Sequence, residues 1–198
     1  LYITLYYPFY DLTAYGKNVL INSKSRNAWW LSKCFWAVSC VFTYFILMWT
    51  IIIIFCVCGA GKLTLNVSKS LIFKMIPMPS ENVFLSEGDL FSNRYLTCQM
   101  LLMPFLIVSA LSVMQMAVSL VIKPFFSFCI SAGILVLSAY YLNPLLLGNY
   151  AMSQRNDLLI DNGVNTKTGI VFSLALLVLS CVVGLFIFRR YDILNKED

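Results

Sequence analysis

Four long apolar stretches without a single Asp, Glu, Lys or Arg constrain this chain more than any other feature. They cover residues 34–58, 96–120, 124–147 and 169–188. Each is about as long as, or longer than, the roughly 20 residues that an α-helix needs to cross a bilayer. Because lipid offers no partner to exposed backbone groups, each stretch should be helical. The sequence therefore predicts an all-α fold, a polytopic integral membrane helix bundle with four complete spans.

The composition agrees with a membrane protein. Hydrophobic residues make up 60% of the 198 residues and charged residues 12%, against about 45–50% and about 25% in soluble domains. This balance excludes a soluble enzyme, a disordered chain and a secreted disulfide mini-protein. The chain contains no histidine, so it lacks the commonest general base and metal ligand. A polytopic membrane enzyme is therefore disfavoured.

The basic residues predict the orientation of the spans. Eight of the 14 Lys and Arg residues lie in the N-terminal segment, in the turn at Lys123 and in the tail 189–198, which share one side of a four-span protein. The loops 59–95 and 148–168 on the other side carry six over more residues. Since cytoplasmic loops are enriched in Lys and Arg, we predict that the first side is cytoplasmic and that both loops are extracytoplasmic.

Residues for catalysis or metal binding are not grouped in the sequence. The seven cysteines lie within or at the edges of the apolar stretches, which favours packed or lipid-facing thiols. Cys56 and Cys58 form a pair, but no further ligands complete a zinc site. The segment 59–64, Gly-Ala-Gly-Lys-Leu-Thr, departs from the phosphate-binding loop in glycine spacing and in the residue after Lys62. We expect no catalytic residue, no metal and no cofactor in this chain.

Three strongly polar side chains lie inside the stretches, namely Gln99, Gln115 and Asn143. Such residues usually hydrogen-bond between helices, and they could also line a polar pathway. Ion-coupled transporters place charged or histidine side chains inside their spans. If the protein transports a substrate, we therefore expect the energy to come from outside this chain.

The segment 11–33 has the chemistry of a helix lying along the membrane surface. Trp29 and Trp30 would anchor it at the headgroups, while Lys24, Arg26 and Lys33 would meet phosphates. One interpretation stops at a juxtamembrane anchor; the other adds docking onto a cytoplasmic partner. Residues 1–10 are apolar and aromatic. We interpret them as the end of a truncated span, with an interfacial aromatic segment as the alternative.

Three short motifs resemble those of one family. A Tyr-Gly pair at 15–16 is followed by Ser-Lys-Ser-Arg-Asn-Ala-Trp-Trp-Leu-Ser-Lys at 23–33. Later come Asn-Pro-Leu-Leu-Leu-Gly-Asn-Tyr-Ala-Met-Ser-Gln-Arg at 143–155 and Phe-Arg-Arg-Tyr-Asp-Ile at 188–193. Together they resemble ABC-2-type ABC transporter permeases. On this resemblance the four stretches are the last four of six spans, and the first span and most of the second are missing.

The resemblance implies the transmembrane permease subunit of an ATP-driven ABC transporter. Its partners would be a separate ABC ATP-binding subunit, which holds ATP and magnesium, a second identical or related permease subunit, and membrane lipids, but no nucleic acid. A cytoplasmic coupling helix in 11–33 would contact the ATP-binding subunit, and Arg189 and Arg190 would anchor the tail with Trp29, Trp30 and Lys33. The coupling residues would be Tyr15, Gly16, Lys17, Asn22, Ser23, Lys24 and Arg26.

The resemblance also suggests a substrate class and a location. Many relatives export hydrophobic compounds, antimicrobial peptides or cell-surface glycans. We expect an exporter of a hydrophobic or amphipathic compound or peptide, in the bacterial cytoplasmic membrane. The alternative is a non-transporting polytopic scaffold or sensor subunit.

Overall fold

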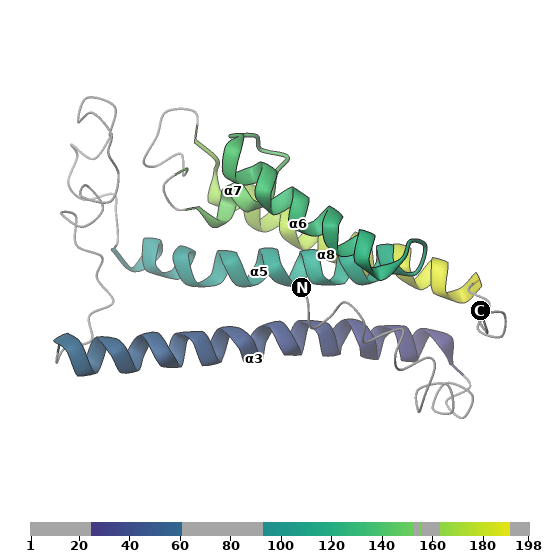
Figure 1. Ribbon diagram of the computed structural model, residues 1–198, viewed down its shortest axis with the longest axis horizontal. Coiled ribbons are helices and arrows are strands. Elements are labelled where there is room, and N and C mark those ends of the chain that lie inside the picture. The colour runs from purple at the N-terminus through teal and green to yellow at the C-terminus, as the bar shows by residue number, and fades with distance from the viewer. Residues whose placement is uncertain (1–24, 61–92, 153–154, 156–162, 191–198) are drawn as a thin grey trace. The chain divides into compact units, whose positions relative to one another are not determined.

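The computed structural model describes residues 25–60, 93–152, 155 and 163–190. The regular elements in these ranges are helices (Figure 1), which confirms the predicted all-α class for this part of the chain. In chain order they are α3 (Arg26–Ala60), α5 (Asn93–Ser119), α6 (Pro124–Tyr140), α7 (Gly148–Ala151) and α8 (Thr166–Arg190).

Three of the helices are long and apolar enough to cross a membrane. These segments are Arg26–Gly59 of α3, Gln99–Ser119 of α5 and Thr166–Arg190 of α8. With 17 residues, α6 is about 25 Å long at 1.5 Å per residue, short of the roughly 30 Å hydrocarbon core. The helices support the prediction of a membrane protein, with α6 as a shorter apolar helix beside three full-length ones.

Helix α3 begins at Arg26, inside the segment predicted to precede the first span. Residues 26–33 contain neither Gly nor Pro, so nothing interrupts the helix before the apolar stretch begins. The Ser25 hydroxyl accepts a 3.4 Å hydrogen bond from the Ala28 backbone N–H, as a helix-capping residue does. The last part of the predicted surface segment is therefore continuous with the span.

Helix α6 ends at Tyr140, whereas the sequence predicted a span over 124–147. The cause lies at Asn143-Pro144. Proline disfavours a helical conformation in the residue before it, and the Asn143 side-chain oxygen accepts a 2.9 Å hydrogen bond from the Leu145 N–H, which stabilises a turn. The apolar stretch therefore continues beyond the helix as a turn that leads into α7.

The chain divides into two compact units. Of the residues that the structure describes, unit 1 comprises 25–42, 108–133 and 173–190, and unit 2 comprises 43–60, 93–107, 134–152, 155 and 163–172. Among the described residues, unit 1 contains the beginnings of α3 and α6 and the ends of α5 and α8. The helix ends that the basic residues assign to the cytoplasmic side thus all belong to unit 1.

Each unit has its own buried apolar residues. The core of unit 1 is formed by Trp29, Trp30, Cys34, Ala37, Val113, Met116, Ala117, Leu120 and Phe188. In unit 2, Phe45 contacts Phe105 edge-to-face with ring centroids 5.9 Å apart, and Tyr150 is buried. In contrast, Ile51, Ile52, Ile53 and Ile54 of α3 are exposed. A run of exposed isoleucines suits a surface that faces lipid rather than water.

The order of the four predicted spans yields a topology prediction. We expect alkaline phosphatase, which needs the disulfide-permitting environment outside the cytoplasm, to be inactive when fused after Lys123 and active when fused after Asn165. Lys123 lies between the second and third predicted spans and Asn165 between the third and fourth, so the positive-inside rule puts them on opposite sides. A fusion after Asp198 serves as the inactive control. Equal activity at Lys123 and Asn165 would contradict the four-crossing topology.

Candidate functional site

The candidate site is the contact between the beginning of α3 and the end of α8 in unit 1, here called the α3–α8 junction. The ring of Phe188 stacks on Trp29 at a centroid distance of 4.7 Å and an interplanar angle of 10°. The same ring lies 6.0 Å from the Trp30 ring at 24°. The side chains of successive helical residues point about 100° apart around the helix axis. Phe188 lies between the two directions in which Trp29 and Trp30 leave α3, so its ring contacts both indoles. This aromatic cluster joins the two helices.

Trp30 is the most enclosed member of the junction, with a fully buried side chain. Its indole Nε1 donates a 3.0 Å hydrogen bond to the Cys181 carbonyl oxygen, so the polar atom of the ring is satisfied. Gly184 makes room for the ring, because a Cβ at that position would collide with the Trp30 indole. Cys181, Gly184 and Phe188 recur at helical spacing on one face of α8. The Trp30 side chain packs against that face of α8.

Polar contacts add to the aromatic cluster at the same helix ends. The Arg26 guanidinium donates to the Arg189 carbonyl at 2.9 Å, and the Arg189 Nε donates to the Asn27 Oδ1 at 2.8 Å. The end of α8 offers carbonyl groups without helical partners and carries partial negative charge, which favours a cation there. The Lys33 Nζ lies 5.0 Å from the Trp29 ring centroid, within cation–π range. Both helix ends are thus held by hydrogen bonds and by stacking.

The structure brings together several residues that the sequence singled out. Arg26, Trp29, Trp30, Lys33 and Arg189 all belong to the junction. The tryptophans, predicted to anchor the chain at the headgroups, have their side chains buried in the unit 1 core. Arg190 is exposed. The predicted coupling residues Tyr15, Gly16, Lys17, Asn22, Ser23 and Lys24 lie outside the described residues.

Unit 2 contains a second polar cluster, centred on Arg155, which the sequence analysis had placed in an outer loop. Its guanidinium donates to the carbonyls of Ser138 at 2.5 Å and of Ala139 at 2.6 Å. It also donates to the Asn149 Oδ1 at 2.5 Å. These carbonyls belong to the last turn of α6, where no backbone N–H is available to them. Arg155 therefore caps the end of α6 by satisfying its final carbonyl groups.

Asn149 and Tyr150 extend this cluster into the turn after α6. The Asn149 amide donates to the carbonyls of Tyr141 at 3.0 Å and Asn143 at 2.8 Å, and the Tyr150 hydroxyl donates to the Pro144 carbonyl at 2.9 Å. Burial raises the pKa of Tyr150, which moves the titration of a phenol that is already neutral near pH 7 still further from neutral pH. The turn after α6 is thus rigidly hydrogen-bonded.

The three polar residues predicted inside the spans have different environments. Gln99 in unit 2 and Gln115 in unit 1 are buried, whereas Asn143 is exposed in the turn. The backbone carbonyl of Gln115 accepts a 2.5 Å hydrogen bond from the Ser127 hydroxyl of α6, which joins α5 to α6. Because this contact uses the backbone of Gln115, the interhelical role predicted for its side chain stays a prediction.

Sequence reasoning missed Cys181, Gly184 and Phe188 at the junction and Arg155 and Asn149 in unit 2. The first three had a usable signal, because they lie at helical spacing on one face and include a glycine. Arg155 had no such signal, since its role depends on where α6 ends. Within the described residues, no group of three or more acidic or cysteine side chains is placed to hold a metal ion.

Comparison with known proteins identifies one family. The sequence model of the family described as "Protein of unknown function (DUF2705)" matches residues 7–194. Searches of curated proteins and of solved structures find no match. The matched family carries no assigned function, so the resemblance to ABC-2-type permeases stays a prediction.

The junction predicts opposite effects for two glycine-to-alanine changes. We expect Gly184→Ala to destabilise the protein, because its Cβ would collide with the Trp30 indole, and overpacking typically costs about 1–3 kcal/mol. Gly133 in α6 has nothing within 4 Å of the corresponding Cβ position, so Gly133→Ala should be neutral or stabilise by up to about 1 kcal/mol. Thermal unfolding in detergent measures both. Equal effects of the two changes would refute the close packing.

Arg155 yields a second stability prediction. We expect Arg155→Gln to lower the free energy of unfolding by roughly 2–4 kcal/mol, because hydrogen bonds to charged groups contribute about 1.5–3 kcal/mol each. Arg155→Lys should retain part of the stability, since lysine keeps the charge but lacks the planar fork. Lys167→Gln, at the exposed beginning of α8, is the matched control for loss of a cation. An Arg155→Gln variant as stable as this control would show that Arg155 does not hold α6.

Proposed function

This chain belongs to the DUF2705 family, and we propose that it is the transmembrane permease subunit of an ATP-driven ABC transporter. In this role it would export a hydrophobic or amphipathic compound or peptide across a cell membrane. It would work with a separate ATP-binding subunit and a second identical or related permease subunit. The partner would hold ATP and magnesium and hydrolyse the ATP. This chain would supply the path for the substrate and would couple ATP hydrolysis to its movement.

The observation that carries the proposal is the α3–α8 junction. The segment that resembles the coupling loop of ABC-2-type permeases leads in the sequence into α3, which begins at Arg26. At that point Arg26, Trp29 and Trp30 all contact the last turns of α8. A displacement of the segment before Arg26 would therefore act on two membrane-length helices at once. This arrangement suits a device that converts movement of a cytoplasmic partner into a rearrangement of spans.

The distribution of charge supports an external energy source. The apolar stretches contain no acidic or basic residue, whereas ion-coupled transporters use such residues as partners for the coupling ion. Within the described part of the chain, the cations lie at or near helix ends or, like Arg155, outside the long helices. A permease driven by a separate ATPase needs no ionisable group within its spans.

Charge reversal at the junction tests the proposal. We expect Arg26→Glu to reduce stimulation of the partner's ATPase roughly fivefold or more, the lower range of typical coupling energies, while the complex still assembles. The change removes the donor to the Arg189 carbonyl and places a carboxylate near the negative end of α8. ATPase of the reconstituted complex and pull-down of the ATP-binding subunit measure the two effects.

Two further variants sharpen this test. Asn27→Ala removes the acceptor of the Arg189 Nε without adding charge and should give a smaller loss of the same kind. Lys167→Glu reverses a charge at the other end of α8, in unit 2, and should leave ATPase stimulation unchanged. If the chain copurifies with no ATP-binding subunit, or if Arg26→Glu leaves ATP turnover intact, a scaffold or sensor subunit becomes the better interpretation.

A further inference from the structure

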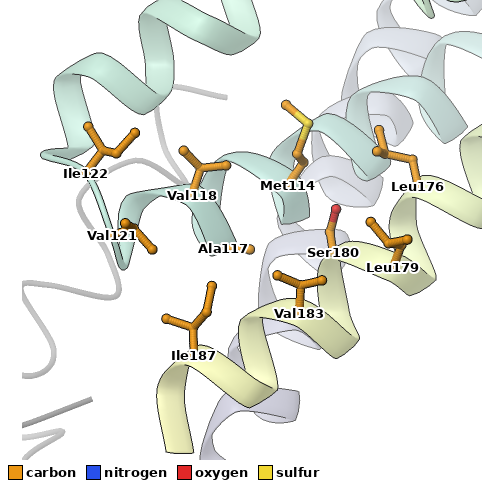
Figure 2. A pocket seen from close by; sticks show the side chains of 10 residues that line it. All are labelled: Met114, Ala117, Val118, Val121, Ile122, Leu176, Leu179, Ser180, Val183 and Ile187. Carbon is orange, nitrogen blue, oxygen red and sulfur yellow. The ribbon is translucent and has the colours of Figure 1, made fainter. Parts of the chain in front are cut away.

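Unit 1 contains an apolar groove between the end of α5 and α8. Its volume is about 410 Å³, within the roughly 300–1,000 Å³ of ligand pockets. Figure 2 shows Val118, Val121 and Ile122 on the side of α5 and Leu176, Val183 and Ile187 on the side of α8. Ser180 adds the groove's one hydroxyl group. Such a groove accepts a hydrocarbon chain and offers almost nothing to a polar ligand.

Small residues give the groove its depth. Ala117 of α5 and Ser180 of α8 both line it and are themselves buried, so larger side chains rise around them. Two of these, Val121 and Leu179, are 69% and 61% exposed. In a chain whose helices suit a membrane, such exposed walls face the acyl chains of the surrounding lipid.

Cations follow the groove at the cytoplasmic end predicted for unit 1. Lys123 comes directly after the lining residue Ile122, and it is exposed. Arg190 lies one helical turn after Ile187 and seven residues after Val183, so it continues the lining face of α8. It is exposed as well. The groove thus has an apolar body with two basic side chains beyond one end.

The charges of this region have one sign. The charged residues in the described part of unit 1 are Arg26, Lys33, Lys123, Arg189 and Arg190, with no Asp or Glu among them. Arg26 and Arg189 are engaged at the α3–α8 junction, whereas Lys123 and Arg190 offer the same chemistry to an external anion. Lys and Arg bind phosphate through charge-assisted hydrogen bonds.

We propose that this groove is a binding site for an anionic phospholipid of the cytoplasmic leaflet. One acyl chain occupies the groove between α5 and α8, and Lys123 and Arg190 bind the phosphate headgroup. A second copy of the chain is a poorer occupant, because a two-fold contact uses the same patch on both copies and would bring two sets of cations into one interface with no Asp or Glu from the described part of unit 1 to balance them. The inference does not depend on the proposed transport function.

Lipid titration of the purified full chain tests this site. Native mass spectrometry in detergent compares phosphatidylglycerol with phosphatidylcholine of the same acyl chains. We expect the wild-type protein to bind phosphatidylglycerol more tightly. The double variant Lys123→Gln/Arg190→Gln should lose about tenfold or more of that affinity, since each basic residue near a membrane contributes to anionic lipid binding. Its affinity for phosphatidylcholine should not change.

A second variant addresses the apolar body of the groove. Val183→Trp fills it and should weaken the binding of both lipids. Val178→Trp is the matched control, because Val178 is an exposed residue of α8 outside the groove. Lys167→Gln is the control for loss of a cation. Helical content by circular dichroism and thermal unfolding verify that each variant is folded.

Four outcomes would overturn the proposal. Equal affinity of the wild-type protein for the two lipids would show that no site recognises the anionic headgroup. Equal losses of affinity in the control variants would show that the site is not located at this groove. Displacement of the lipid by glycerol 3-phosphate alone would show that the groove contributes nothing. A Val183→Trp protein that changes its oligomeric state but not its lipid binding would identify the groove as an interface between copies.

Discussion

The packing of Trp29 and Trp30 against Phe188 is the contact on which unit 1 depends. In lipid, two apolar helices gain little from hiding their side chains from each other, because the surrounding tails are equally apolar. Association must come from close fit and from hydrogen bonds across the interface. The junction supplies both: Gly184 lets the Trp30 ring approach α8, and the indole N–H donates to the Cys181 carbonyl. The beginning of α3 is therefore tied to the end of α8, whatever partner acts on it.

The Arg155 cluster in unit 2 supplies hydrogen-bond donors to backbone carbonyls, which lipid cannot do. Helix α6 ends after 17 residues, and its final carbonyls would otherwise lack donors. Arg155 supplies them, and Asn149 and Tyr150 do the same for the turn that follows. An unsatisfied backbone group costs several kcal/mol where water is absent, by rough estimates. A non-helical turn in an apolar stretch is thus compatible with a membrane protein when side chains complete its hydrogen bonds.

The structure also separates basic residues that look equivalent in a count of charges. Arg26 and Arg189 are bound to atoms of the facing helix, which suits the coupling role that we propose for the junction. Lys123 and Arg190 are exposed and follow the lining residues Ile122 and Ile187 of an apolar groove, which suits the anionic lipid that we propose. The positive-inside rule predicts that all of these residues share one side. It does not distinguish a cation that fastens two helices from one that binds a headgroup.

The sequence by itself determined that the described part of the chain is helical and that its long helices suit a membrane, and it predicts which helix ends share a side. These properties follow from local hydropathy and charge, which can be read from each stretch of sequence without knowing its neighbours in the fold. It also contains the Asn143-Pro144 signal that ends α6, which the prediction of a span over 124–147 does not use. Only the tertiary structure decided that Trp29 and Trp30 are buried, that Gly184 faces Trp30, and that Arg155 completes α6. These facts depend on which faces of distant segments meet, and neither periodicity nor composition specifies the partner of a helix face.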